Sequence, residues 1–224
     1  MVNYIFKGFQ NNTNEKSETM LNIDFDGTAS EPPSALGIAR VAGKEREAKI
    51  IYSNLWKECE KIVENSPTDR LISDVVEAHK KYLKQGALLL KDLPITILSE
   101  VECHPGPHFE KIVKMAKDRG GLKVLSYTDE RIVENFFNCH SVPNYGVLGS
   151  RLESVDGRLT GNFSYIVSKP KGYMGGDSVG DSAGDLELFK MTHERDYRNF
   201  VAKSDKTVMF EKALKKLGIP YQII

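Results

Sequence analysis

The sequence predicts an α/β fold, a three-layer sandwich with a mostly parallel central sheet and an inserted α-helical cap. Three observations lead to this prediction. Short apolar runs alternate with amphipathic helical segments in the second half of the chain, which is the pattern of βα units. A long stretch of helical character, from about residue 35 to residue 90, interrupts the alternation after the first apolar run. A chain of 224 residues, 40% of them hydrophobic, can bury the core of one domain with a large insertion or of two small domains.

The first predicted elements are a short buried strand, LNIDF, and the helical stretch that follows it. Apolar residues recur in that stretch at helical spacing, and no convincing strand pattern interrupts it. We therefore assign residues 20–30 and 104–224 to the α/β core and residues 31–103 to the cap. The helical spacing is clearest at Leu71, Ile72, Val75, Val76, His79 and Leu83.

The remaining core elements follow in the order expected of a layered α/β protein. The segment HFEKIVKMAKDRGG predicts an amphipathic helix ended by glycines; the strand LKVLS and the helix DERIVENFF come next. Residues 145–167 predict two strands joined by a turn at Asp156–Gly157. The helix TVMFEKALKKLG and the short strand YQII close the chain. This order favours a mostly parallel sheet with helices on both faces.

The charge balance argues against two classes of partner. Lysine plus arginine and aspartate plus glutamate number 31 each, so no overall field attracts nucleic acid or an anionic membrane surface. No apolar run approaches the ~20 residues that span a bilayer. We therefore expect a small molecule as the partner, bound at a local site, and leave the oligomeric state open.

Cysteine content and the N-terminus bear on the compartment. The three cysteines, Cys59, Cys103 and Cys139, are odd in number and lack the spacing of a metal site, which favours a reducing compartment, with the cytoplasm as the expected location. Residues 1–19 are polar, without the long apolar core of a secretory signal. They form an N-terminal extension that could be a tail, an extra edge strand through residues 4–6, or a product of start-site choice.

Two clusters of aspartates indicate a functional site. Asp24 and Asp26 close the first strand, and ligands of such sheets bind beyond the carboxyl ends of the strands. Two carboxylates this close repel each other unless a cation or a shared proton intervenes, and hard oxygen ligands suit Mg²⁺. Asp and Gly also favour turns for local reasons. A second cluster, Asp177, Asp181 and Asp185 at a loop-to-helix junction, favours a site over two unrelated turns.

The two clusters resemble motifs of the haloacid dehalogenase (HAD) superfamily, and within it the phosphoserine-phosphatase-like branch with a helical, C1-type cap. The family's first motif, Asp-x-Asp-Gly-Thr, is matched by residues 24–28, and its fourth, Gly-Asp-Ser-x-x-Asp, by residues 180–185. Ser126 closes the strand LKVLS as the second motif requires. The third motif is a lysine after DGRLTG, for which we favour Lys171 over Lys169.

This resemblance implies a Rossmann-like core and an Mg²⁺-dependent phosphatase that hydrolyses a small phosphorylated metabolite. Asp24 would be the nucleophile that becomes an aspartyl-phosphate, and Asp26 the general acid and then the general base. Alternatives on the same scaffold are a phosphotransferase or mutase, which would need a second substrate as acceptor, and a non-catalytic module that binds metal or phosphate.

The family pattern also assigns the supporting residues. Asp185 would orient Lys171 or a metal-bound water from behind the ligands. The Mg²⁺ ligands would be Asp24, the backbone carbonyl of Asp26, and Asp181. The phosphate would be bound by Ser126, with Tyr127 or Thr128 as alternatives, by Lys171, and by backbone amides near Phe25 and Gly27.

Several features depart from the family pattern or stay outside it. Only nine residues separate Lys171 from Asp181, so the usual helix between the third and fourth motifs is shortened. The fourth motif has two registers, with Asp177 and Asp181 or with Asp181 and Asp185, and we prefer the second. Pro33 stands where phosphoserine phosphatases carry an acid, so phosphoserine is not supported as the substrate. We expect loop and helix-start residues at His104 and His108, and cap core at Tyr52, Trp56 and Tyr82.

Overall fold

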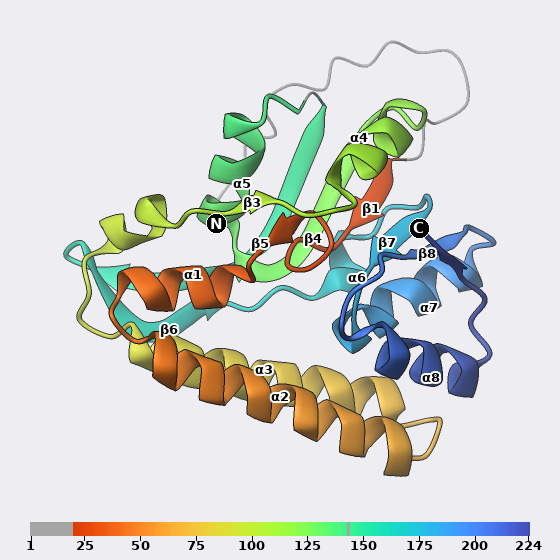
Figure 1. The fold of residues 1–224 in the computed structure, drawn as a ribbon, viewed down its shortest axis with the longest axis horizontal. Helices are drawn as coiled ribbons and strands as arrows, with labels where there is room; N and C mark the ends of the chain where they lie inside the picture. Colours follow the sequence, from red (N-terminus) through yellow and green to blue (C-terminus); the bar gives the residue numbers. More distant parts are fainter. Residues whose placement is uncertain (1–19, 143) are drawn as a thin grey trace.

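The structure is a computed structural model, which describes residues 20–142 and 144–224. The expectations for residues 1–19 lie outside the described residues. A seven-stranded sheet in the order β6-β5-β4-β1-β7-β8-β9 forms the centre of the molecule (Figure 1). Every neighbouring pair is parallel except β5 and β6, which are antiparallel. This confirms the predicted fold class. The strands are β1 (Leu21–Ile23), β4 (Leu122–Asp129), β5 (Tyr145–Val155), β6 (Arg158–Tyr165), β7 (Ser178–Gly180), β8 (Asn199–Val201) and β9 (Gln222–Ile223).

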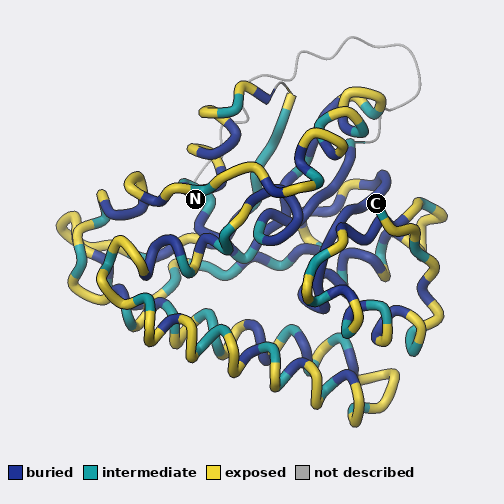
Figure 2. The backbone as a smooth tube through the Cα atoms, viewed as in Figure 1, coloured by how far each residue is buried: buried dark blue, intermediate teal, exposed yellow. Residues whose placement is uncertain are grey.

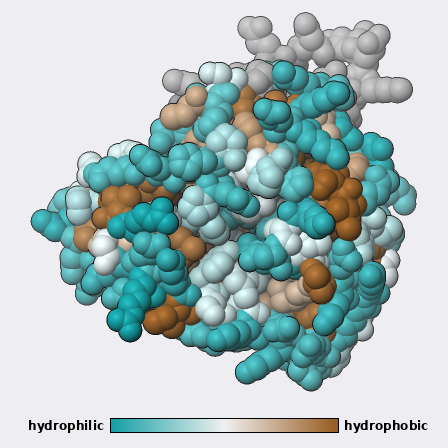
Figure 3. All heavy atoms as spheres, in the orientation of Figure 1, coloured by the Kyte–Doolittle hydropathy of each residue, from teal (hydrophilic) through white to brown (hydrophobic). Residues whose placement is uncertain are grey.

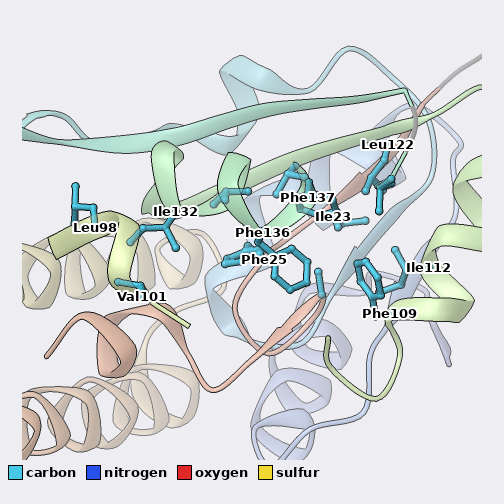
Figure 4. Close-up of a cluster of buried hydrophobic side chains, with 14 of the residues drawn as sticks. Ile23, Phe25, Leu98, Val101, Phe109, Ile112, Leu122, Ile132, Phe136 and Phe137 are labelled. Atoms are coloured by element: carbon cyan, nitrogen blue, oxygen red, sulfur yellow. The ribbon is translucent and has the colours of Figure 1, made fainter. Parts of the chain in front are cut away.

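Helices cover both faces of the sheet because the side chains of its central strands alternate between two buried clusters. Val124 belongs to the cluster under α4 (Phe109–Lys117) and α5 (Glu130–Cys139), which Figure 4 shows in close-up. Leu125 belongs to the cluster under α7 (Leu186–Glu194) and α8 (Thr207–Leu217). Successive residues of a strand point to opposite faces, so a strand buried on both faces reads as a continuous apolar run. The buried strands run through the middle of the molecule in Figure 2.

The segment between β1 and α4 is helical, as the spacing of its apolar residues predicts. It contains α1 (Ser34–Val41), α2 (Glu45–Asn65), α3 (Leu71–Leu89) and the 3₁₀ helix η1 (Ile95–Glu100). The long helices α2 and α3 lie side by side below the sheet in Figure 1. A short antiparallel pair, β2 (Ser30–Glu31) with β3 (His104–Pro105), brings the two ends of this segment together. The limits 31–103 for the cap stay a prediction.

Four short strands and two short helices are absent from the sequence prediction: β2, β3, β7, β8, η1 and α6. His104, expected in a loop, lies in β3. The strands β7 and β8 have only three residues each. The single turn α6 (Lys169–Gly172) is the one helix between β6 and β7 among the described residues. It lies between the third and fourth motifs, where the sequence predicts that the usual helix is shortened. The predicted helix TVMFEKALKKLG agrees with α8, which ends before Gly218, whose left-handed backbone (φ 66°) suits glycine. The predicted strand LKVLS is longer in the structure and continues to Asp129.

Most residues on the face shown in Figure 3 are hydrophilic. Hydrophobic residues form small separated patches on the face shown in Figure 3. In the part of the chain that the structure describes, no helix combines the length and the apolar character that crossing a membrane requires.

Candidate active site

Three strand ends meet at the carboxyl edge of the sheet and position the site. Strand β1 lies between β4 and β7, and all three are parallel. Their carboxyl ends therefore lie along one edge, which brings Asp24, Ser126 and Asp181 together. The backbone N–H of Asp24 still donates to the carbonyl of Val179 at 3.0 Å, so Asp24 continues the β1 ladder. The fold thus creates the cluster that the two aspartate motifs predicted.

Asp24, Asp181 and Asp185 form one buried carboxylate group. Each offers an oxygen within 4.8 Å of an oxygen of the others. Burial raises the pKa of Asp24 to about 6, against the pull of Lys169, and the nearby Asp185 adds to the rise. Burial likewise raises the pKa of Asp181 to about 7, although Lys206 opposes it. Three acids that share a site out of water need nearby positive charge.

Lys169 supplies part of that charge. Its Nζ donates to Oδ1 of Asp24 at 2.7 Å and to Oδ1 of Asp185 at 2.5 Å, and the residue is only 1% exposed. Burial opposes the charge on Lys169, but the two carboxylates outweigh it and raise its pKa. The preference for Lys171 is therefore wrong in placement: Lys171 is exposed. Residues two apart on a helical turn point to nearly opposite sides, so only one lysine of α6 can face Asp24.

Asp185 holds this arrangement in place. Its Oδ2 accepts the backbone N–H groups of Asp181 and Ser182, at 3.1 and 3.3 Å, while its Oδ1 accepts Lys169. The orienting role expected of Asp185 is thus directed at Lys169. The register of the fourth motif is settled by position, because Asp177 lies at the opposite end of β7 and pairs with Arg119 and Arg198.

Asp26 faces the cap side of the site. Its Oδ1 accepts the backbone N–H of Ser34 at 2.8 Å, and its Oδ2 accepts the hydroxyls of Ser34 and Thr128, both at 2.8 Å. Loss of water around the carboxylate raises the pKa of Asp26, and these hydrogen bonds offset only part of that rise. The first residue of α1 and the end of β4 therefore fix the second aspartate of the motif.

Gly27 has a different role from the one expected. Its backbone N–H donates to the carbonyl of Ser30 at 2.9 Å, so the expectation that this amide binds phosphate is not met. Its φ of 79° is left-handed, and a Cβ there would stand 2.3 Å from Oδ2 of Asp181. Glycine is needed because the carboxylate occupies that space. The Phe25 side chain points into the core against Phe136 (Figure 4), and its backbone N–H lies against the Asp24 carboxylate.

Ser126, Tyr127 and Thr128 all line the same cavity, but they differ in their partners. The hydroxyl of Thr128 binds Asp26, and the ring of Tyr127 stacks on His79 with centroids 5.6 Å apart. Ser126 is 2% exposed, and its Oγ accepts the backbone N–H of Thr128 at 3.2 Å. Its hydroxyl proton remains for a further acceptor, so Ser126 is the best placed of the three to donate to a phosphate.

The carboxylate group fits a magnesium ion. Oδ1 of Asp181 is buried and has no hydrogen-bond partner among the described residues, which is costly unless a cation or a water satisfies it. The other oxygens are hard carboxylate ligands, as Mg²⁺ prefers. Asp24 and Asp181 are thus the side chains that would hold the ion. The backbone carbonyl of Asp26 as a third ligand stays a prediction.

Sequence reasoning missed Lys206, a second, partly buried cation. Its Nζ lies 3.3 Å from Oδ2 of Asp181 and 4.8 Å from the centre of the Trp56 ring. Lys206 follows β8, next to β7 in the sheet, so the topology could have located it. The signal was absent because β8 was not predicted. The sequence also did not predict that Ser34 and Thr128 bind Asp26. These contacts connect the cap and β4 to the end of β1, and such long-range contacts leave no local pattern.

A cavity of about 170 Å³ lies between this edge of the sheet and the cap helices. Asp24, Asp26 and Lys169 line one end. Three aromatic residues of the cap also line it, which the sequence analysis had assigned to the cap core: Tyr52, Trp56 and Tyr82. All three are only partly buried. Trp56 and Tyr82 pack against the core cluster, and the ring of Tyr52 contacts that of Trp56, so these residues pack in the cap and also face the site.

Comparison with known proteins agrees on the fold. A scan against protein families and a search of curated proteins gave no match. Among solved structures, a phospho-aspartyl intermediate analogue of phosphoserine phosphatase is 24% identical, with a TM-score of 0.62, over 88% of this chain and 91% of that one. A HAD family hydrolase from Salmonella enterica serovar Typhi has a TM-score of 0.63 at 16% identity, covering 93% and 68%. Cytosolic 5'-nucleotidase IIIB bound to cytidine has a TM-score of 0.60 at 15% identity, covering 92% and 79%.

The likeness extends over nearly the whole chain in each case, cap segment and sheet alike. At these identities it shows the fold alone. The chain therefore has the fold that these phosphoserine phosphatase and HAD family hydrolase structures share.

Proposed function

We propose that this chain is an Mg²⁺-dependent phosphatase that hydrolyses a small phosphate monoester through an aspartyl-phosphate. One observation carries the proposal. Asp24 stands at a strand end with one oxygen held by Lys169, while Asp26, two residues on, is held separately on the cap side of the same cavity. A nucleophile and a proton donor need this division of position and of environment.

In the first step, the Asp24 oxygen that does not bond Lys169 attacks phosphorus, and the ester bond to the leaving oxygen breaks. Asp26 gives its proton to that oxygen, so the leaving group departs as an alcohol. The raised pKa of Asp26 favours the protonated form that this step requires. Lys169 and the hydroxyl of Ser126 offset the charge on the phosphoryl oxygens.

In the second step, Asp26 takes a proton from a water molecule whose oxygen attacks the phosphorus of the aspartyl-phosphate. The bond between phosphorus and Asp24 breaks, which releases inorganic phosphate and returns Asp24 as a carboxylate. Mg²⁺, held by Asp24, Asp181 and the carbonyl of Asp26, would supply further charge neutralisation when bound.

The solved structures support this choice of chemistry. Several of the similar proteins are phosphoserine phosphatases, and one of them is described as an analogue of a phospho-aspartyl intermediate. Another is a nucleotidase, so the shared fold carries phosphate release from more than one kind of substrate. Those descriptions belong to the other proteins; here they favour hydrolysis of a phosphate monoester over an unrelated reaction.

The test is phosphate release from p-nitrophenyl phosphate by the purified full chain with Mg²⁺. Asp24→Asn should lower kcat by roughly 10³-fold or more, since it removes the nucleophile. Asp156→Asn makes the same acid-to-amide change in the exposed turn between β5 and β6 and should leave kcat unchanged. Equal rates for Asp24→Asn and wild type would refute the proposal.

The alternative phosphotransferase predicts a different result in the same assay. Radiolabelled phosphate would stay on the protein without turnover in water, and adding an alcohol acceptor would restore release. Rapid turnover in water with no added acceptor excludes that alternative.

A further inference from the structure

The cavity over the site has two chemically different ends. At the sheet edge its lining is polar, with Asp24, Asp26 and Lys169. Away from that edge, α1, α2, α3 and β6 contribute mainly apolar and aromatic side chains. We call these residues the apolar wall; its principal members are Ile38, Ile51, Tyr52, Trp56, Leu83 and Phe163.

The charged groups that line the cavity already have partners within the protein. Lys169 is shared by Asp24 and Asp185, and Asp26 is held by two hydroxyls and a backbone N–H. Asp129, the remaining one, binds Arg131 at 2.7 Å and accepts the backbone N–H of Leu152 at 2.8 Å. Of the described residues that line the cavity, none offers an uncommitted charge to an ammonium or a carboxylate of a substrate.

The size of the cavity limits the substrate further. An apolar cavity of about 150 Å³ holds one benzene ring. This cavity measures about 170 Å³ and is only partly enclosed, so it favours a leaving group of about one ring beside a phosphoryl group that reaches the open side. The ring of Trp56 lies edge-on to those of Tyr52 and His79, with centroids 5.6 Å apart in each pair. Such a wall accepts a flat ring or a short branched chain by edge and face contacts.

We infer that the substrate is a phosphate monoester whose leaving group is uncharged, largely apolar and about the size of a single aromatic ring. The inference rests on the proposed phosphatase function and names its substrate class. The phosphoryl group lies at the polar end and the leaving group against the apolar wall. An amino-acid leaving group is disfavoured because none of the charged side chains in the described lining is free to pair with its ammonium or carboxylate group. The Nε1–H of Trp56, buried without a hydrogen-bond partner, adds only a neutral donor to the wall.

The experiment compares kcat/KM for benzyl phosphate and phosphoserine, whose leaving alcohols are of similar acidity, with acetyl phosphate as a substrate too small to need the wall. The expected kcat/KM for benzyl phosphate exceeds that for phosphoserine by about 100-fold or more, as unpaired polar groups discriminate strongly. Equal values, or a preference for phosphoserine, overturn the inference. Turnover of acetyl phosphate with no such preference leaves the phosphatase proposal standing, whereas no turnover of any of the three, in wild type and Asp24→Asn alike, removes the phosphatase proposal itself.

A variant of the wall tests the location. Gly86 lines the cavity from α3, and a Cβ built on it meets nothing within 4 Å. Gly86→Leu should fill the cavity while favouring the helix, so folding is not at risk. We expect kcat/KM for benzyl phosphate to fall at least 10-fold and that for acetyl phosphate to stay within twofold.

The matched control is Lys84→Leu, which adds the same side chain to an exposed position of the same helix outside the cavity lining. It should leave both substrates unaffected. If Gly86→Leu spares benzyl phosphate, or if it lowers both substrates equally, the leaving group does not lie against this wall and the inference fails.

Discussion

The two ends of the three-residue strand β7 carry carboxylates in opposite circumstances. Asp177, before the strand, is held by Arg119 and Arg198, and although burial works against its charge, these hydrogen bonds lower its pKa. Asp181, after the strand, lies against Asp24 and Asp185, and its pKa is raised to about 7. Two nearly identical pieces of sequence, GDSV and GDSA, therefore contain acids with opposite pKa shifts: Asp177 is paired with arginines, and Asp181 is crowded by other carboxylates.

The difference teaches how to separate structural from functional acids in this chain. Asp177 has its counter-charges within the protein, so its contribution is to stability. The acids at the carboxyl edge hold one oxygen without any partner among the described residues and share too little positive charge. Groups left in such a state point to a ligand that completes them.

The largest expected effect tests whether Asp181, unlike Asp177, is needed for activity. Asp181→Asn should lower kcat by roughly 10³-fold, or about 4 kcal/mol, because in the proposed mechanism Asp181 is a ligand for Mg²⁺. Titration calorimetry with Mg²⁺ should show the matching loss of affinity. Asp177→Asn, measured well below its unfolding temperature, serves as the control and should keep both; equal losses in the two variants would mean that the acids do not differ as described.

The next effect tests whether Asp177, unlike the acids at the carboxyl edge, contributes to stability. Asp177→Asn should lower the free energy of unfolding by about 2 to 3 kcal/mol, since it leaves Arg119 with no anion; exposure of Arg198 limits the loss. Asp24→Asn should not lower stability in the absence of metal, because the raised pKa shows that its charge disfavours the folded state. Urea unfolding of both variants measures this, and a shared loss would contradict it.

The pKa of His79 indicates how well the cap excludes water from the carboxyl edge of the sheet. Burial lowers its pKa from 6.5 to about 4, and Lys169 and Lys206 add to the drop. The unfolded chain thus binds a proton more readily than the folded one, so stability falls as pH falls from 6.5 towards 4, by about 3 kcal/mol for this group.

The measurement is urea unfolding at several pH values between 7 and 4.5. In His79→Gln, the free energy of unfolding should depend less on pH than in wild type, by an amount that corresponds to close to one proton fewer taken up on unfolding. An unchanged slope would show that the imidazole is hydrated, and that the cap does not seal this side of the site.

The smallest expected effect concerns Ser34, the cap residue that binds Asp26. Ser34→Ala removes one of the hydrogen bonds to its carboxylate and should lower kcat by roughly 10-fold, or about 1.4 kcal/mol, while KM changes little. Ser53→Ala, on the exposed side of α2, should change neither constant. A rise in KM with kcat unchanged would argue that Ser34 positions the substrate and not the carboxyl group of Asp26.

Most of the fold could be predicted from the sequence because its longer elements carry clear periodicity. The helices α4, α5 and α8 and the strands β4 to β6 all show it. The failures are the two-residue strands β2 and β3 and the three-residue strands β7 and β8. Three residues are too few to show alternation, and the glycines and serines around β7 resemble a loop. Long-range parallel pairing, which no local pattern records, turns these triplets into strands.

The site was predictable to the extent that it lies within motifs. Asp24, Asp26, Ser126, Asp181 and Asp185 lie together at the carboxyl edge, as the order of the motifs implied. The choice between two lysines two residues apart depended on the direction of one helical turn, which the sequence KPKG does not reveal. Lys206 depended on an unpredicted strand.

The close approach of Gly27 to Asp181 has a consequence for anyone who wishes to redesign the chain. Any side chain at position 27 would displace a carboxylate oxygen, so the two positions act as one unit and the loop that contains Gly27 cannot be diversified by itself. Libraries aimed at new substrates should leave this loop intact. They should vary the apolar wall instead, where Gly86 offers open space and a substitution does not disturb the carboxylates.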